Sequence, residues 1–330
     1  MKTIKVNPEF GIELVLAVPY AYWLHKQGKL EKVITSKGMK PFYYFCKNVE
    51  ERFSHRTIDN AVAGLNELPN NWIHHNSEVV FGKDYSELSE EDKINANGVL
   101  DYSQWTPPPY REHYKNEEFK FDDRPLVFVS NKFNLEHGEA PYGYFDVECL
   151  YNIFSYLTDA GYSVIYKRAT NKEKGLSIDQ NEINSVNLGY NDILANVTGR
   201  GVISDRQLPQ MMDNVYLFDD IKSKYSYNEK QLKIMANCEG FISVCGGNSI
   251  LSSYFGGSMI SYVHKGTELR PGYFGENSYF RKLSNAKIIP TYDVIGKINK
   301  NTYDYEVNTT GKQDYTKLIE NIKENFKGVK

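Results

Sequence analysis

The stretch GFISVCGGNSILSSYFGG, residues 240–257, decides the fold that we expect for this chain. Its apolar run at 241–244 predicts a strand buried within a sheet. Two glycines follow at 246–247, and then come Asn248 and Ser249, residue types that commonly begin helices. The stretch therefore predicts a strand, a tight glycine turn and the start of a helix.

The same stretch continues into a second strand. A helical run at 250–255 ends at the glycines 256–257, and a new apolar run begins at 259–263. Backbone N–H groups at the start of such a helix suit a phosphate or diphosphate. A tight turn without a ligand would use the same glycines, but the order of the surrounding elements favours the phosphate interpretation.

Composition limits the class of protein. The length of 330 residues suggests two domains, each large enough for its own core. A formal net charge of −3, with acids and bases mixed, argues against a non-specific nucleic-acid binder, so we expect no nucleic-acid partner. The longest early apolar run, 14–21, is too short to span a bilayer. The four cysteines form no Cys-x-x-Cys pair, which predicts reduced thiols and a cytoplasmic location.

The amino-terminal segment is expected to form a strand–loop–helix–strand unit. The strands are predicted at 3–6 and 32–35, with a helix at 12–27 between them and a third short strand or buried turn at 41–46. Glu13 lies at the mouth of the first loop, on the edge of an α/β sheet where ligands bind. An exposed glutamate in the first turn of a helix is an equally good interpretation.

A proline-rich segment follows at 101–114, with a charged linker at 115–124. Three consecutive prolines force an extended path. The segment could wall a sugar site, because Trp105, Tyr110 and His113 flank the prolines, or it could be a rigid strap between domains. The sequence gives these two interpretations equal weight.

The second half alternates strands and helices, which predicts a doubly wound parallel sheet. Beyond the glycine stretch, the expected strands are 126–130, 162–166, 201–204 and 215–218, and the expected helices are 145–160, 227–237 and 315–326.

Cations and donors follow three of these strands. They are Asn131 and Lys132, Lys167 and Arg168, and the turn at 246–249. On one sheet edge, fixed positive charge and aligned N–H groups would hold a diphosphate and stabilise it as a leaving group. A single residue of this kind could simply be solvated at the end of a loop. Three such strand ends on one sheet favour a diphosphate site.

Other phosphate chemistries lack their signatures. The chain has no Asp-x-Asp, so protein cations rather than a metal are expected to neutralise the leaving group. It also has no Gly-x-Gly-x-x-Gly and no P-loop, which argues against NAD and ATP sites. We expect no metal site and no cofactor.

These features together resemble glycosyltransferases of the GT-B type. The Gly11-Ile12-Glu13…Pro19 segment is similar to the Gly-Asp…Pro first loop of heptosyltransferase-type enzymes, where the acid is the catalytic base. The loop with Ser130, Asn131, Lys132 and Glu136, together with the glycine stretch, resembles glycosyltransferase-like proteins of surface-polysaccharide clusters and large DNA viruses.

The resemblance implies an α/β fold of two Rossmann-like domains that face a cleft. Residues 1–120 would bind the acceptor and residues 121–312 the nucleotide-sugar, while a helix at 313–330 would pack back on the amino-terminal domain. The donor would be a nucleotide-sugar and the acceptor a glycan or another hydroxyl compound. The reaction would be a metal-independent, inverting transfer of a hexosyl or deoxyhexosyl group.

The resemblance also implies roles for individual residues. Glu13 would be the base, with His25 and His113 in reserve, and Lys132 and Arg168 would stabilise the departing nucleoside diphosphate. The donor-binding set would be Asn131, Lys132, Glu136, Lys167, Arg168, Gly246, Gly247, Asn248, Ser249 and, for the ribose, Glu268.

Two rival functions remain open at this point. A sugar-nucleotide epimerase of the same architecture would use several acids around the sugar, and Glu13, Asp101 and Glu136 could serve. A non-catalytic protein that grips a phosphosugar or a glycan would bind its ligand without turnover.

Overall fold

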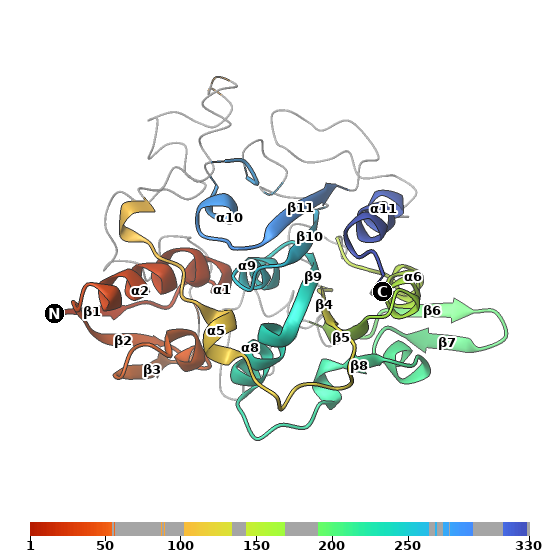
Figure 1. Ribbon diagram of the computed structural model, residues 1–330, viewed down its shortest axis with the longest axis horizontal. Helices are drawn as coiled ribbons and strands as arrows, with labels where there is room; N and C mark the ends of the chain where they lie inside the picture. Colours follow the sequence, from red (N-terminus) through yellow and green to blue (C-terminus); the bar gives the residue numbers. More distant parts are fainter. Residues whose placement is uncertain are drawn as a thin grey trace.

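The computed structural model in Figure 1 contains two parallel sheets and one small hairpin. It describes residues 1–54, 56, 87, 89, 102–133, 143–168, 191–263, 268, 273–276, 278–292 and 313–328. Helices cover the sheets, and the fold class is α/β, as predicted. Glu136 and Asp101 lie outside the described residues.

The first sheet contains three parallel strands in the order β1-β2-β3. These are β1 (Lys2–Lys5), β2 (Leu30–Ser36) and β3 (Val49–Phe53). One helical segment joins β1 to β2 and contains α1 (Phe10–Ile12), a π-helical turn (Glu13–Ala17) and α2 (Val18–Lys26). The Glu9 carboxylate accepts hydrogen bonds from the N–H groups of Gly11 and Ile12, which fixes the start of this segment.

The buried turn predicted as one alternative for 41–46 is confirmed. A 3₁₀ turn (Lys40–Tyr43) buries Phe42 and Tyr43. The third strand instead forms from the polar sequence VEERF at 49–53, where no strand was predicted. β3 is the edge strand of its sheet, and edge strands can carry charged side chains that the apolar pattern does not reveal.

The larger sheet contains six parallel strands in the order β11-β10-β9-β4-β5-β8. Their bounds are β4 (Leu126–Asn131), β5 (Ser163–Arg168), β8 (Val215–Leu217), β9 (Cys238–Val244), β10 (Ser258–Val263) and β11 (Lys287–Tyr292). The helices are α6 (Val147–Asp159) and α11 (Thr316–Asn325) on one face, and α8 (Tyr227–Asn237) and α9 (Gly247–Ser253) on the other. The short helices are α5 (Tyr110–Tyr114) and α10 (Tyr279–Lys282).

Two expectations about this half are wrong. The strand predicted at 201–204 belongs to an antiparallel hairpin, β6 (Leu194–Val197) with β7 (Gly201–Ser204), and not to the parallel sheet. The last helix, α11, packs against β10, β11 and α6 instead of against the amino-terminal domain, as Figure 1 shows. Leu318 and Ile322 account for this placement, because they bury their side chains among those of the larger sheet.

The proline-rich segment joins the two sheets. The Trp105 indole donates a hydrogen bond to the carbonyl of Leu16 at 2.8 Å. Arg111 donates to the carbonyls of Cys238, at 2.7 Å, and Phe255. These contacts reach the first helical segment on one side and the larger sheet on the other, so they support the strap interpretation.

A second contact between the two sheets runs through the helices. The Tyr254 hydroxyl donates to the carbonyl of Leu14 at 2.7 Å. A single buried apolar cluster includes Ile4 and Val33 of the first sheet and Phe128 of the larger one. The end of α9 therefore lies against the first helical segment, and its start does so as well, because Gly247 lies close to Phe10 and Gly11.

Gly257 is expected to tolerate alanine poorly. Its φ is +73°, and an added Cβ would overlap the carbonyl oxygen of Glu239 in β9. Gly28 has a φ of +65° and no atom near that position, so it is a matched control. We expect Gly257→Ala to cost about 3 kcal/mol or more, and Gly28→Ala about 1–2 kcal/mol, in the free energy of unfolding. Urea unfolding checks this, and equal losses would contradict it.

Within the described residues, no helix combines the length and the apolar composition that crossing a bilayer requires.

Candidate functional site

The glycine turn lies at the carboxyl end of β9, in the middle of the larger sheet. Gly246 has a φ of 141°, a conformation that L residues rarely adopt, and it precedes α9 directly. The Gly246 N–H donates to the Ser249 hydroxyl at 3.1 Å, and that hydroxyl donates back to the Gly246 carbonyl at 2.7 Å. Ser249 is thus buried inside the turn and closes it, and its role in binding the donor stays a prediction.

The helix starts earlier than predicted, at Gly247 instead of residue 250. The N–H groups of Gly247 and Asn248 therefore belong to its first turn, where no intrahelical acceptor exists. Neither donates to an acceptor in the described part of the chain. Two backbone donors are thus presented at the turn.

Lys132 lies beside the turn, as predicted. It follows β4 directly, and its N–H donates to the Asn131 side chain at 3.0 Å. A Cβ added at Gly246 would lie 3.7 Å from the Lys132 Nζ. A side chain at 246 would therefore crowd the ammonium group, and glycine leaves that space open.

Lys167 also reaches the turn, but from within β5 and not from a loop after the strand. Its Nζ donates to Gln231 Oε1 at 2.6 Å and to Asn248 Oδ1 at 3.1 Å. Burial lowers the pKa of Lys167 to about 7, against an opposing effect of the Asp219 charge. This lysine therefore holds a proton weakly and sits directly under the turn.

The two bonds to Asn248 Oδ1 fix the orientation of that side chain. Lys167 Nζ and Gln231 Nε2, at 3.3 Å, both donate to the same oxygen. An ammonium group can only donate, so the amide oxygen must face it. The Asn248 Nδ2 group is consequently directed away from the lysine as a donor.

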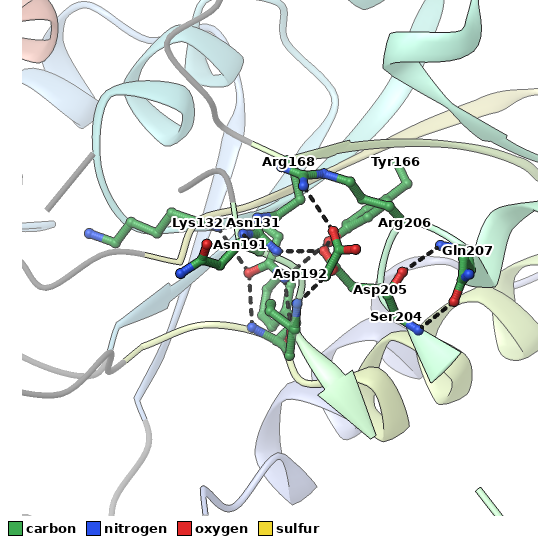
Figure 2. A network of polar contacts seen from close by, with 12 residues as sticks. Asn131, Lys132, Tyr166, Arg168, Asn191, Asp192, Ser204, Asp205, Arg206 and Gln207 are labelled. Carbon is green, nitrogen blue, oxygen red and sulfur yellow. Dashed lines mark hydrogen bonds and ion pairs between the residues drawn. The ribbon is translucent and has the colours of Figure 1, made fainter. Parts of the chain in front are cut away.

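Arg168 turns to the opposite face of the sheet from Lys167, into a buried ion pair, and its role at the donor stays a prediction. Its Nη1 donates to Asp205 Oδ2 at 2.6 Å and its Nη2 to the carbonyl of Asn191 at 2.9 Å (Figure 2). Successive residues of a strand point to opposite faces, so Lys167 and Arg168 cannot both face the same helix. Arg168 forms a fully buried ion pair on the α6 side.

Asn131 belongs to the same buried network, and its role at the donor stays a prediction. Its Nδ2 donates to the Phe145 carbonyl at 2.8 Å, and its Oδ1 accepts from the N–H groups of Phe145 and Lys132. The Tyr166 hydroxyl connects Asn131 to Asp205. Figure 2 shows the Lys132 side chain pointing away from this network, which holds only its backbone.

Glu268 is close enough to the turn to act on it electrostatically. The pKa of the Cys245 thiol is raised to about 12, first by burial and then by the Glu268 charge, and the Lys132 ammonium acts in the opposite direction. Cys245 immediately precedes Gly246. A carboxylate and an ammonium group thus both act on the residue that leads into the turn.

Glu13 is buried, and its role as a base stays a prediction. Its Oε1 accepts from the hydroxyls of Thr35 and, at 2.9 Å, Tyr43, and its Oε2 pairs with Arg56 Nη1 at 2.7 Å. Its side chain has 0% exposure. A base must reach a substrate hydroxyl with a carboxylate oxygen, and in this structure both oxygens of Glu13 accept hydrogen bonds from within the protein.

Neither reserve base is brought to the turn. His25 is exposed at the end of α2, next to the loop that leads into β2, and so at the opposite edge of the first sheet. His113 stacks on Tyr44 at 3.6 Å, and burial lowers its pKa. Both histidines pack against aromatic rings within the first 114 residues of the chain.

No three His, Cys, Asp or Glu side chains gather as a metal site would require, as far as the described residues go. The expectations of no metal and no cofactor stay predictions.

No family model matches the sequence, and no curated protein matches it. Among solved structures, the chain is similar to the ADP-heptose LPS heptosyltransferase II of E. coli, with 10% identity and a TM-score of 0.49, over 99% of this chain and 98% of that chain. It is also similar to a glycosyltransferase of family 9 from Veillonella parvula, with 11% identity and a TM-score of 0.43, over 88% and 85% of the two chains. The UDP-GlcNAc 2-epimerase of Neisseria meningitidis is similar at 13% identity and a TM-score of 0.31, over 76% and 79%. Likenesses this distant assign no function, which must be argued from the site itself.

Proposed function

We propose that this chain is a GT-B-type glycosyltransferase that transfers a sugar from a nucleotide-sugar to a hydroxyl of a glycan or a similar acceptor. One observation carries the proposal. Lys132 after β4, Lys167 in β5 and the glycine turn after β9 come from three separate strand ends and meet at one point. Ligands of open parallel sheets bind at the carboxyl ends of the strands, which is where these groups lie.

The chemistry of the meeting point suits a departing diphosphate. Lys132 supplies an ammonium group beside Gly246, and the turn supplies the N–H groups of Gly247 and Asn248. Lys167 acts through Asn248, whose amide it orients. Donors and cations held in place before the reaction stabilise charge as it develops on the leaving group.

The remaining parts of the proposal follow from this placement. The nucleoside diphosphate would occupy the larger sheet, within residues 121–312, and the acceptor would approach from residues 1–120. Glu268 is close enough to the turn to contact the nucleoside. Metal independence, inversion and a cytoplasmic location belong to the proposal, and the base is left unassigned.

Replacing Lys132 should test the donor site directly. We expect Lys132→Ala to weaken nucleoside-diphosphate binding about 10- to 100-fold, because one charge-assisted contact of about 1.5–3 kcal/mol is lost. Melting temperature should change little. Isothermal titration calorimetry measures the affinity, and Lys120→Ala, at a lysine paired with Glu117 on the surface, is the control. Equal affinity in both variants would refute the placement of the diphosphate.

The donor itself can be found by thermal shift. A ligand that binds the native state raises the apparent melting temperature, so UDP-, GDP-, CDP-, ADP- and dTDP-sugars can be ranked. Product analysis with the selected donor then separates the candidates. Transfer to an added acceptor supports the proposal, whereas an epimerised donor or binding without turnover would replace it.

A further inference from the structure

A second charged site lies at the carboxyl edge of the first sheet, and the proposed function does not yet use it. Glu13 and Arg56 form an ion pair with side-chain exposures of 0% and 8%. Thr35, in β2, and Tyr43, in the 3₁₀ turn, donate their hydroxyls to the same carboxylate. Three donors from three segments therefore hold the carboxylate in one orientation.

Only part of the Arg56 guanidinium is used by this arrangement. Its Nη1 donates to Glu13 and to the Pro8 carbonyl at 2.8 Å. Its Nε and Nη2 donate to no acceptor within the described residues. Neither nitrogen is completely shielded from solvent, so a ligand can reach them. A guanidinium group has five N–H donors in a rigid plane, so one edge is held and the other can be offered to a ligand.

The offered edge belongs to the same neighbourhood as the glycine turn. The Arg56 guanidinium carbon lies 5.5 Å from the centroid of the Phe10 ring. The Cδ1 atom of that ring is 2.8 Å from the position that a Cβ on Gly247 would take. Arg56 and the turn thus contact one aromatic side chain, Arg56 from the segment that follows β3 and Gly247 from the start of α9.

The packing of α1 on α9 keeps this relation fixed. A Cβ on Gly11 would lie 3.1 Å from the Ile250 Cδ1, so the two helix starts approach closely only because glycine occupies both. Phe10 is held in addition by an edge-to-face contact with Phe42, at 5.5 Å between ring centroids. A ligand on the turn would therefore meet Arg56 at a set position.

We propose that Glu13 is a positioning residue for Arg56, and that Arg56 binds a phosphate oxygen of the diphosphate held by the glycine turn. This inference rests on the proposed function, because it takes the turn to be the diphosphate site. Arg56 would bring to the leaving group a cation from the other half of the molecule, complementing Lys132. Glu13 would then hold Arg56 in place and take no proton from the acceptor.

Calorimetry with inorganic pyrophosphate on the full chain tests this assignment. We expect Arg56→Ala to weaken binding about 10- to 100-fold, the effect of losing one charged hydrogen-bond donor. Glu13→Gln keeps the shape of the side chain but releases the guanidinium, so it should weaken binding about 3- to 10-fold. In the double variant Glu13→Gln should add nothing, because the residue that it positions is gone.

The base hypothesis predicts a different pattern. A catalytic base contributes to turnover and not to anion binding, so Glu13→Gln with unchanged pyrophosphate affinity would overturn the positioning role. Where Arg56→Ala fails to fold, Arg56→Lys serves instead, because lysine can still pair with Glu13 but lacks the planar second edge. It should bind pyrophosphate more weakly than the wild-type chain, and wild-type affinity would overturn the proposed contact.

Lys132→Ala distinguishes this inference from the proposed function on which it rests. If Lys132→Ala weakens pyrophosphate binding and the Arg56 variants do not, only the role of Arg56 falls. If neither change affects the affinity, the diphosphate site itself is wrong.

Discussion

Asp205→Ala is expected to lower the free energy of unfolding by about 3–5 kcal/mol, a large share of the stability of an ordinary domain. The Asp205 carboxylate accepts from Arg168 Nη1 and the Tyr166 hydroxyl, each at 2.6 Å, and from the Ile193 N–H at 2.9 Å. Both members of the ion pair have 0% side-chain exposure. Removing the carboxylate takes the counter-charge from a buried guanidinium and removes the acceptor of the Tyr166 hydroxyl and of the Ile193 N–H.

The measurement is urea unfolding followed by circular dichroism. Where the wild type and the variant have the same dependence of the unfolding free energy on urea concentration, the shift of the midpoint gives the change in stability. Asp192→Ala is the matched control, since Asp192 pairs with Arg206 at 2.9 Å on the surface. Exposed pairs contribute about 0–1 kcal/mol. Should Asp205→Ala not accumulate, Asp205→Asn replaces it, with a loss of about 1–3 kcal/mol. If Asp205→Ala lowered the free energy of unfolding no more than the control does, the network of Figure 2 would not be a major source of stability.

The strands of the larger sheet could be predicted because each is a nearly continuous apolar run. This pattern is typical of parallel strands buried on both faces, and β4, β9 and β10 all show it. β3 has the opposite composition, with three charged residues among five, and only its pairing with β2 makes it a strand. Pairing is a long-range property, so local pattern could not reveal it.

The glycine turn and the position of Lys132 beside it could be predicted for a related reason. Glycine pairs mark close approaches, and a residue that directly follows a parallel strand must lie at the carboxyl edge of the sheet. For Lys167 and Arg168 the same rule predicted that both side chains reach the turn, and only Lys167 does. They are the last two residues of β5, and the alternation of side chains allows only one of them to face α9.

The partners of the buried charges could not be predicted at all. Glu13 meets Arg56 and Thr35 only after the first sheet is assembled, and Asp205 meets Arg168 across a separation of 37 residues. A charged residue beside a loop looks the same in sequence whether it faces solvent or an ion pair. Burial, and not residue type, places both Glu13 oxygens in hydrogen bonds within the protein.

Lys167 should make the stability of the protein depend on pH between about 7 and 10. Burial beneath Asn248 lowers its pKa to about 7, whereas an unfolded lysine titrates near 10.4. Between these values the unfolded chain binds one proton more than the folded chain, so the free energy of unfolding rises with pH. Over the whole interval the gain would approach roughly 4.6 kcal/mol, and below pH 7 this contribution would become constant.

The useful window is pH 7.5 to 8.5, below the range in which unfolded tyrosines and lysines titrate. There the wild-type chain should gain about 1 kcal/mol relative to Lys167→Met, measured by urea unfolding at each pH. Lys222→Met, at an exposed lysine, should follow the wild type. If the free energy of unfolding changed with pH in the same way for the wild type and Lys167→Met, the buried ammonium group would keep its proton throughout this pH window. A weakly held proton matters for the proposed site, because a diphosphate on the turn would favour the charged form of Lys167 and so draw a proton into the protein as it binds.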